Sequence, residues 1–158
     1  MPASTFAAPL ESRYFEDYEP DTVHEFGSVV VEEAEVLEFA QRYDPQPFHT
    51  NPEAAKQSPY GGLIASGLHT LSFGFRLLID TGVFADCSLG SPGIEKIRWL
   101  LPVRPGDILR IEAEVVAMRP SSSNPGRGIL TMDYMVINQR GETVLTMEAI
   151  HFLRRRNK

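Results

Sequence analysis

The sequence contains a single cysteine, Cys87, so the chain cannot form a disulfide bond within itself. This usage is typical of proteins from a reducing compartment. Basic residues are in the minority: 15 lysines and arginines stand against 21 aspartates and glutamates, and the formal net charge is −6. A net-acidic chain is poorly suited to general binding of nucleic acid or of anionic membranes, so neither is expected as a partner.

Long hydrophobic runs are also missing. The most apolar stretch, residues 63–85, is interrupted by His69, Arg76 and Asp80, whereas a bilayer span needs about 20 mostly apolar residues. The first ten residues carry no lysine or arginine and no long apolar run, so they do not resemble a secretory signal. We therefore expect a cytoplasmic protein without a membrane-spanning segment.

Length and composition are those of one folded domain. The 158 residues are 42% hydrophobic and 23% charged, which is ordinary for a folded protein and argues against disorder. A chain near this length can bury roughly 70% of its unfolded surface. Prolines at positions 2, 9 and 20 favour an extended segment. We expect an N-terminal arm over residues 1–20 and a single domain over residues 21–158.

Two helices are predicted from apolar residues that recur at helical spacing. The first covers residues 33–43 and ends before Pro45, because a proline pushes the preceding residue out of the helical region. Residues 44–59 contain four prolines and are predicted to form a loop, with a short helical turn at residues 54–56. The longer helix covers residues 65–81 and is apolar on most sides, so we expect it to be buried.

Strands are predicted where the apolar residues recur with period two. We expect a short strand at residues 29–31 and longer strands at residues 94–101, 107–118, 129–138 and 143–153. Each long strand has one apolar face; that of residues 107–118 is expected to hold Leu109, Ile111, Ala113, Val115 and Ala117. Consecutive one-sided strands imply an antiparallel sheet with one covered face.

These elements predict an α+β fold, in which a curved antiparallel sheet wraps around the long central helix. Such a sheet leaves an edge strand with unpaired backbone groups. Pairing with a second copy of the chain would remove this edge, so we expect a homodimer.

Candidate chemistry is concentrated at the loop after the first helix. Asp44 and His49 stand near the ends of this loop, and Pro45 and Pro47 between them restrict the backbone. An imidazole and a carboxylate held in fixed geometry can exchange protons with a substrate or a water molecule at neutral pH. Each residue alone would more often be structural, as a helix or loop cap or as a satisfied histidine.

A glycine-rich segment, Gly61-Gly62-Leu63-Ile64-Ala65-Ser66-Gly67, leads into the long helix. The N-terminus of a helix exposes free backbone N–H groups. Because Gly67 has no side chain, its N–H can approach a carbonyl oxygen and stabilise a developing oxyanion. A packing glycine at position 67 and a helix N-cap at Ser66 are the structural alternatives.

Together these residues resemble the MaoC-like dehydratase family, the (R)-specific enoyl-CoA hydratases of hotdog fold. The family's motif has an Asp, four residues and a His, which match Asp44 and His49, followed by a small-residue-plus-glycine step that matches Gly67. The resemblance covers residues 29–153 and includes Arg98-Trp99-Leu100-Leu101-Pro102-Val103-Arg104-Pro105-Gly106-Asp107. Gln46 departs from the family, which commonly has Asn at this position.

The resemblance implies reversible addition of water across the double bond of a trans-2-enoyl-CoA thioester. Asp44 and His49 would form the catalytic acid–base dyad, and the Gly67 N–H would bind the thioester oxygen. Ser66, Phe48, Gln46 and Tyr60 are the candidate substrate-binding residues. No metal or cofactor is implied, since coenzyme A is part of the substrate and the lone cysteine and four scattered histidines have no metal-ligand spacing.

Two other functions remain open from the sequence. A hotdog thioesterase would hydrolyse the thioester, usually with a lone carboxylate on or near the central helix. A non-catalytic domain would only bind acyl-CoA. His69, two residues beyond Gly67 on the polar line of the long helix, is interpreted as a structural residue or a dimer contact.

Overall fold

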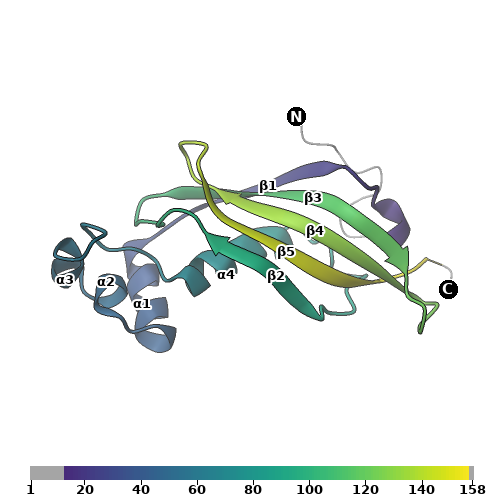
Figure 1. The fold of residues 1–158 in the computed structure, drawn as a ribbon, viewed down its shortest axis with the longest axis horizontal. Helices are drawn as coiled ribbons and strands as arrows, with labels where there is room; N and C mark the ends of the chain where they lie inside the picture. Colours follow the sequence, from purple (N-terminus) through teal and green to yellow (C-terminus); the bar gives the residue numbers. More distant parts are fainter. Residues whose placement is uncertain (1–12, 157–158) are drawn as a thin grey trace.

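The computed structural model describes residues 13–156 of the chain (Figure 1). The elements follow one another in the order η2 (Phe15–Asp17), β1 (Val23–Val30), α1 (Glu33–Tyr43), α2 (Pro47–Thr50), α3 (Pro52–Lys56), α4 (Gly67–Ile79), β2 (Gly93–Trp99), β3 (Ile108–Pro120), β4 (Arg127–Ile137) and β5 (Thr143–Arg154). The predicted first helix and the four long strands are thus present.

The strands form one antiparallel sheet in the order β1-β3-β4-β5-β2. Figure 1 shows α4 along one face of this curved sheet and α1, α2 and α3 gathered at one end of it. The predicted α+β arrangement of a sheet wrapped on a long helix is confirmed. The core lies between them, where Phe73, Leu77 and Leu78 of α4 are buried.

Two strands differ from the prediction because of irregular pairing. β1 begins at Val23 rather than at residue 29. Gly27 has a positive φ of 67° and the pairing register shifts before Val29, so the apolar and polar residues of this strand do not alternate regularly and the sequence pattern misses its first half. In β3 the register also shifts between Val115 and Ala117. Ala117 is therefore exposed, contrary to the prediction, and Met118 packs against the core instead.

The proline-rich segment is more helical than predicted. Pro47 occupies the first turn of α2, where its missing N–H costs nothing, so part of the predicted loop is a helical turn. The short turn predicted at residues 54–56 is confirmed as α3, which Asn51 caps by accepting hydrogen bonds from the N–H groups of Glu53 and Ala54. α4 is shorter than predicted because it starts at Gly67, after its N-cap Ser66.

The two ends of the described chain meet at the other end of the sheet. Phe15 is buried against Gly128, where a Cβ atom would collide with its ring. Arg155 Nε donates to Glu16, and the Arg156 guanidinium donates to Asp17 at 2.6 Å. Residues 1–12 of the predicted arm lie outside the described residues.

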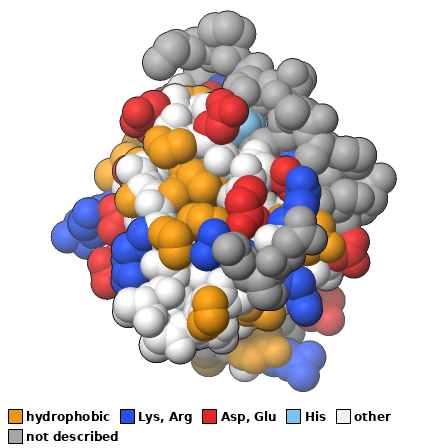
Figure 2. Space-filling model, turned by 90° about the vertical axis from the view of Figure 1, so that its right-hand side faces the viewer, with side chains coloured by type: hydrophobic (Ala, Val, Ile, Leu, Met, Phe, Trp, Pro, Cys, Tyr) orange, Lys and Arg blue, Asp and Glu red, His pale blue; other side chains and the backbone are white. Residues whose placement is uncertain are grey.

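The surface at this end carries charges of both signs. Figure 2 shows acidic and basic side chains interspersed around apolar ones. Between residues 13 and 156, none of the helices has the length and apolar character needed to cross a membrane.

Candidate functional site

The predicted dyad lies where α1, α2 and the start of α4 meet. Asp44 is the C-cap of α1, because its N–H donates to the Ala40 carbonyl just before Pro45 ends the helix. His49 belongs to α2, and Ser66 is the N-cap of α4. The short elements around the prolines therefore bring together side chains from three helices.

Asp44 is held at both of its carboxylate oxygens. Gln46 Nε2 donates to Oδ1 at 2.6 Å, and Ser66 Oγ donates to Oδ2 at 2.7 Å. Partial burial tends to raise the pKa of Asp44, but these hydrogen bonds and the nearby charge of His49 outweigh burial and leave the pKa below its ordinary value. Asp44 is therefore a carboxylate at neutral pH.

His49 is buried beside this carboxylate. Its Nδ1 lies 2.8 Å from the carbonyl oxygen of Ile64, and since a carbonyl can only accept, Nδ1 carries a hydrogen. The other ring nitrogen, Nε2, lies 3.3 Å from Asp44 Oδ2. A proton on Nε2, or a water molecule that donates to both atoms, satisfies this pair. Nε2 is thus the nitrogen that can exchange protons next to the carboxylate.

Ser66 has the structural role considered from the sequence and a second role that the sequence did not predict. Its Oγ accepts a hydrogen bond from the Leu68 N–H at 3.3 Å, as an N-cap does. The same hydroxyl donates to Asp44, which stands 22 positions earlier in the chain. Ser66 is completely buried behind Asp44 and does not line the cavity described below. Ser66 therefore binds the Asp44 carboxylate without being exposed to the cavity.

Gly67 opens α4, and its N–H belongs to the first turn, where backbone donors have no acceptor within the helix. Trp99 Nε1 donates to the Gly67 carbonyl at 2.8 Å. A Cβ atom on Gly67 would lie 2.7 Å from the Trp99 ring, so the close approach of the indole requires glycine here. Gly67 therefore has the packing role considered from the sequence, and it also lines the cavity described below.

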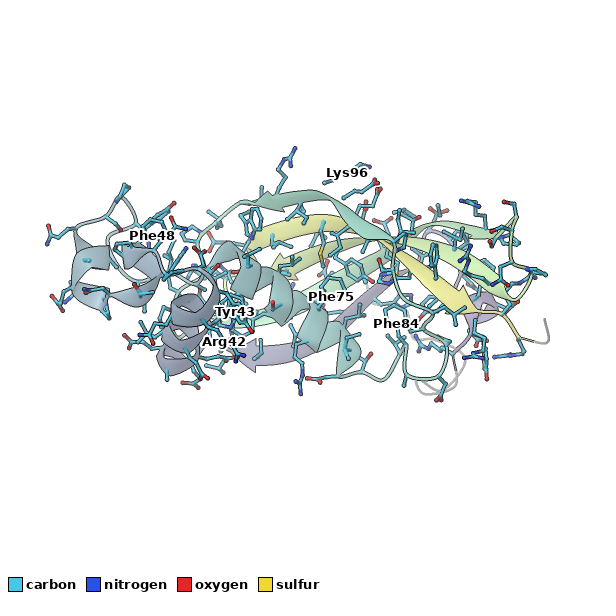
Figure 3. All side chains as sticks on the ribbon, turned by 90° about the horizontal axis from the view of Figure 1, so that it is seen from below. Arg42, Tyr43, Phe48, Phe75, Phe84 and Lys96 are labelled. Atoms are coloured by element: carbon cyan, nitrogen blue, oxygen red, sulfur yellow. The ribbon has the colours of Figure 1, made fainter. Side chains whose placement is uncertain are left out.

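A cavity of about 490 Å³ opens beside these residues, within the usual size range for small-molecule sites. Its lining includes the sequence-predicted residues Asp44, Gln46, Phe48, His49, Tyr60 and Gly67. Figure 3 shows Phe48 among the short helices at this end. The ring of Phe48 lies 4.5 Å from the His49 ring and 5.4 Å from that of Tyr60, so it forms the wall next to the dyad.

The opposite wall was not predicted as part of the site. It consists of Trp99, the last residue of β2, and the four residues after it, Leu100, Leu101, Pro102 and Val103. The first three are half-exposed apolar side chains. Their contact with α4 joins positions more than thirty residues apart, and the only signal in the sequence was that they fall in the segment resembling the family. Within residues 13–156, no three His, Cys, Asp or Glu residues cluster closely enough to hold a metal ion.

Comparisons with known proteins agree with this geometry. The model of the MaoC like domain matches residues 16–133. The structure of the MaoC-like dehydratase from Rhodospirillum rubrum superposes with a TM-score of 0.85 at 38% identity and covers 93% of this chain and 100% of that chain. The (R)-hydratase from A. caviae involved in PHA biosynthesis has a TM-score of 0.69 at 27% identity, over 85% of this chain and 96% of that chain.

A sequence relative of similar length is YdeM of Bacillus subtilis, a protein whose activity is uncharacterized. It is 30% identical over 128 residues, which are 81% of this chain and 89% of YdeM.

Proposed function

The chain belongs to the MaoC-like domain family and has its hotdog fold, and on this premise we propose that it is an (R)-specific hydratase of trans-2-enoyl-CoA thioesters. The observation that carries the proposal is the Asp44–His49 pair, which lies in an apolar cavity beside the N-terminus of α4. Coenzyme A enters as part of the substrate, and the reaction needs no metal or redox cofactor.

The reaction adds a water molecule reversibly and in the syn sense. The water oxygen forms a bond to Cβ of the enoyl group while the dyad accepts a proton from that water. The π electrons move toward the thioester carbonyl, and the dyad delivers a proton to Cα. Because Nε2 of His49 lies 3.3 Å from Oδ2 of Asp44, the two proton transfers are assigned to the pair rather than to either residue alone.

Charge that develops on the thioester oxygen would be stabilised by the Gly67 N–H. A fixed backbone donor at such a position lowers a barrier by about 3–4 kcal/mol. The N-terminal end of α4 adds a favourable partial positive charge at the same place. Phe48 and Tyr60 would form the wall along the acyl group, and Gln46 and Ser66 would hold the carboxylate.

The test follows the absorbance of the conjugated enoyl thioester with crotonyl-CoA and a longer enoyl-CoA, beside a dye that traps free thiol. Loss of the conjugated signal without thiol release, in the wild type but not in Asp44→Asn or His49→Ala, is the expected result. Thiol release would instead assign a thioesterase. Acyl-CoA binding without turnover on either substrate would favour the non-catalytic alternative.

The chain would act as a homodimer. β2 is an edge strand of the sheet, and three apolar side chains at its end are half-exposed: that of its last residue, Trp99, and those of Leu100 and Leu101, which follow it. A second copy would cover both features. Light scattering coupled to size-exclusion chromatography should give twice the mass of 17.7 kDa; the mass of one chain would contradict the dimer.

A further inference from the structure

A row of aromatic rings connects α1 to α4. The imidazole of His69 lies between the rings of Phe39 and Phe73, with centroid distances of 4.4 and 4.1 Å and interplanar angles of 6° and 20°. Tyr43, the last residue of α1, extends the row 5.1 Å beyond Phe39. Figure 3 shows Tyr43 on α1 beside the N-terminal half of α4. The rings thus form a continuous contact between the two helices.

His69 is an unexpected member of this row because it is polar and buried, with 3% of its surface exposed. Its Nε2 lies 3.6 Å from a carboxylate oxygen of Glu35, and its Nδ1 is buried without a hydrogen-bond partner among residues 13–156. Burial lowers the pKa of His69 although Glu35 opposes the shift. A neutral ring with its hydrogen on Nε2 fits these contacts, because it leaves only an acceptor unsatisfied.

The helices that the rings join also carry the site at their ends. Asp44 caps the C-terminus of α1, Ser66 caps the N-terminus of α4, and their side chains share a hydrogen bond of 2.7 Å. Phe39 precedes Asp44 by five positions, and His69 follows Ser66 by three. The ring contact therefore lies about one turn behind the hydrogen bond, and the two together fix how α1 meets α4.

Resting on the proposed function, we propose that His69 is a positioning residue for the hydration reaction. Its ring, clamped between Phe39 and Phe73, sets the end of α1 against the first turn of α4. This contact holds the Asp44 carboxylate at the distance from Ser66 and the Gly67 N–H that the reaction requires. His69 itself does not line the cavity, so it acts through the two helices rather than on the substrate.

The experiment compares the wild type with His69→Ala, which removes the ring, and His69→Phe, which keeps a ring of similar shape. Ser72→Ala is the matched control, because Ser72 is exposed on the same helix and bonds only to the preceding turn. For each protein, kcat and KM for enoyl-CoA hydration are measured. The titration of the Asp44 carboxyl is followed by carbon NMR, with Asp44→Asn to assign its signal.

His69→Ala should lower kcat at least tenfold with KM within about twofold, since a misplacement near 1 Å can cost about a hundredfold in rate. The pKa of Asp44 should rise toward its ordinary value because the bond from Ser66 lengthens. His69→Phe should recover most of kcat, and Ser72→Ala should match the wild type.

The proposal would be overturned if His69→Ala kept both the Asp44 pKa and the kcat of the wild type. It would also be overturned if the kcat of His69→Phe were no higher than that of His69→Ala. If circular dichroism shows that His69→Ala does not fold, Phe39→Leu removes the opposite face of the stack, and the same outcomes apply. If the wild type hydrates none of the thioesters, the proposed function fails, and the Asp44 titrations still decide whether His69 positions the carboxylate.

Discussion

The hydroxyl of Ser66 both caps α4 and donates to the charged Asp44 carboxylate, and the stability of Ser66→Ala measured over a range of pH separates these two effects. The substitution removes the acceptor for the Leu68 N–H and the donor to the Asp44 carboxylate. Loss of an N-cap costs about 1 kcal/mol. Loss of a hydrogen bond to a charged group costs about 1.5–3 kcal/mol. Because the Asp44 side chain is 20% exposed and partly solvated, the lower end of that range applies.

We therefore expect Ser66→Ala to lower the free energy of unfolding by about 2.5 kcal/mol at pH 7. For a chain of this length that corresponds to a fall in Tm of about 5–10 °C. The two contributions depend differently on pH. The pKa of Asp44 is lowered in the folded protein, so the stability from its charged form is present above the ordinary carboxyl pKa and is lost as the pH falls through the folded pKa.

The difference between Ser66→Ala and the wild type should consequently shrink to about 1 kcal/mol, the capping part, once Asp44 is protonated. Urea unfolding at a series of pH values from 7 to well below the ordinary pKa of an aspartate measures this difference. Ser66→Thr is the control, since threonine keeps the hydroxyl that caps and donates. A loss that stays constant across the series would refute the assignment of part of the stability to the bond with Asp44.

Three further outcomes follow from the geometry. Asp44→Asn should reduce hydration at least about a hundredfold, the usual scale of acid–base catalysis, in the enoyl-CoA absorbance assay, and an unaffected rate would exclude the carboxylate from the reaction. Gly67→Ala should lower kcat because its Cβ collides with the Trp99 ring; the double variant with Trp99→Leu should recover part of the rate, and no recovery would locate the defect elsewhere. Burial lowers the pKa of His151, which bonds to the Tyr134 hydroxyl at 2.7 Å, to about 4. As the pH falls, the unfolded chain takes up this proton before the folded protein does, so the free energy of unfolding should fall as the pH drops from about 6.5 to 4. His151→Gln should weaken this dependence of the free energy of unfolding on pH, and an unchanged dependence would contradict the reasoning.

The local part of the structure could be predicted from the sequence because local patterns determine it. α1 occupies the predicted residues 33–43, because the helical spacing of its apolar residues and the proline that ends it, Pro45, all lie within one short segment. The buried faces of β4 and β5 alternate as expected because their pairing is regular over most of their length. Ala117 was misassigned because one register shift turns every following side chain to the other face.

The contacts that shape the site could not be predicted in the same way. Asp44 and His49 were found because both lie in one short segment with a recognisable spacing. The bond from Ser66 to Asp44 and the contact of Trp99 with Gly67 join positions far apart in the chain, and no local pattern encodes which hydroxyl or indole arrives there. Nor did the pattern distinguish a buried His69 from an exposed one, since both occupy the same helical spacing.

The pairing of Arg155 and Arg156 with Glu16 and Asp17 has a practical consequence for measurement. It places both ends of the described chain at one end of the molecule, while the short helices around the cavity lie at the other end (Figure 1). A protein tethered to a sensor surface through a residue of η2 or of the last turn of β5 would present its cavity to the flowing solution. The affinity for thioesters could then be measured on immobilised protein, because the sensor surface would contact the end of the molecule opposite the cavity.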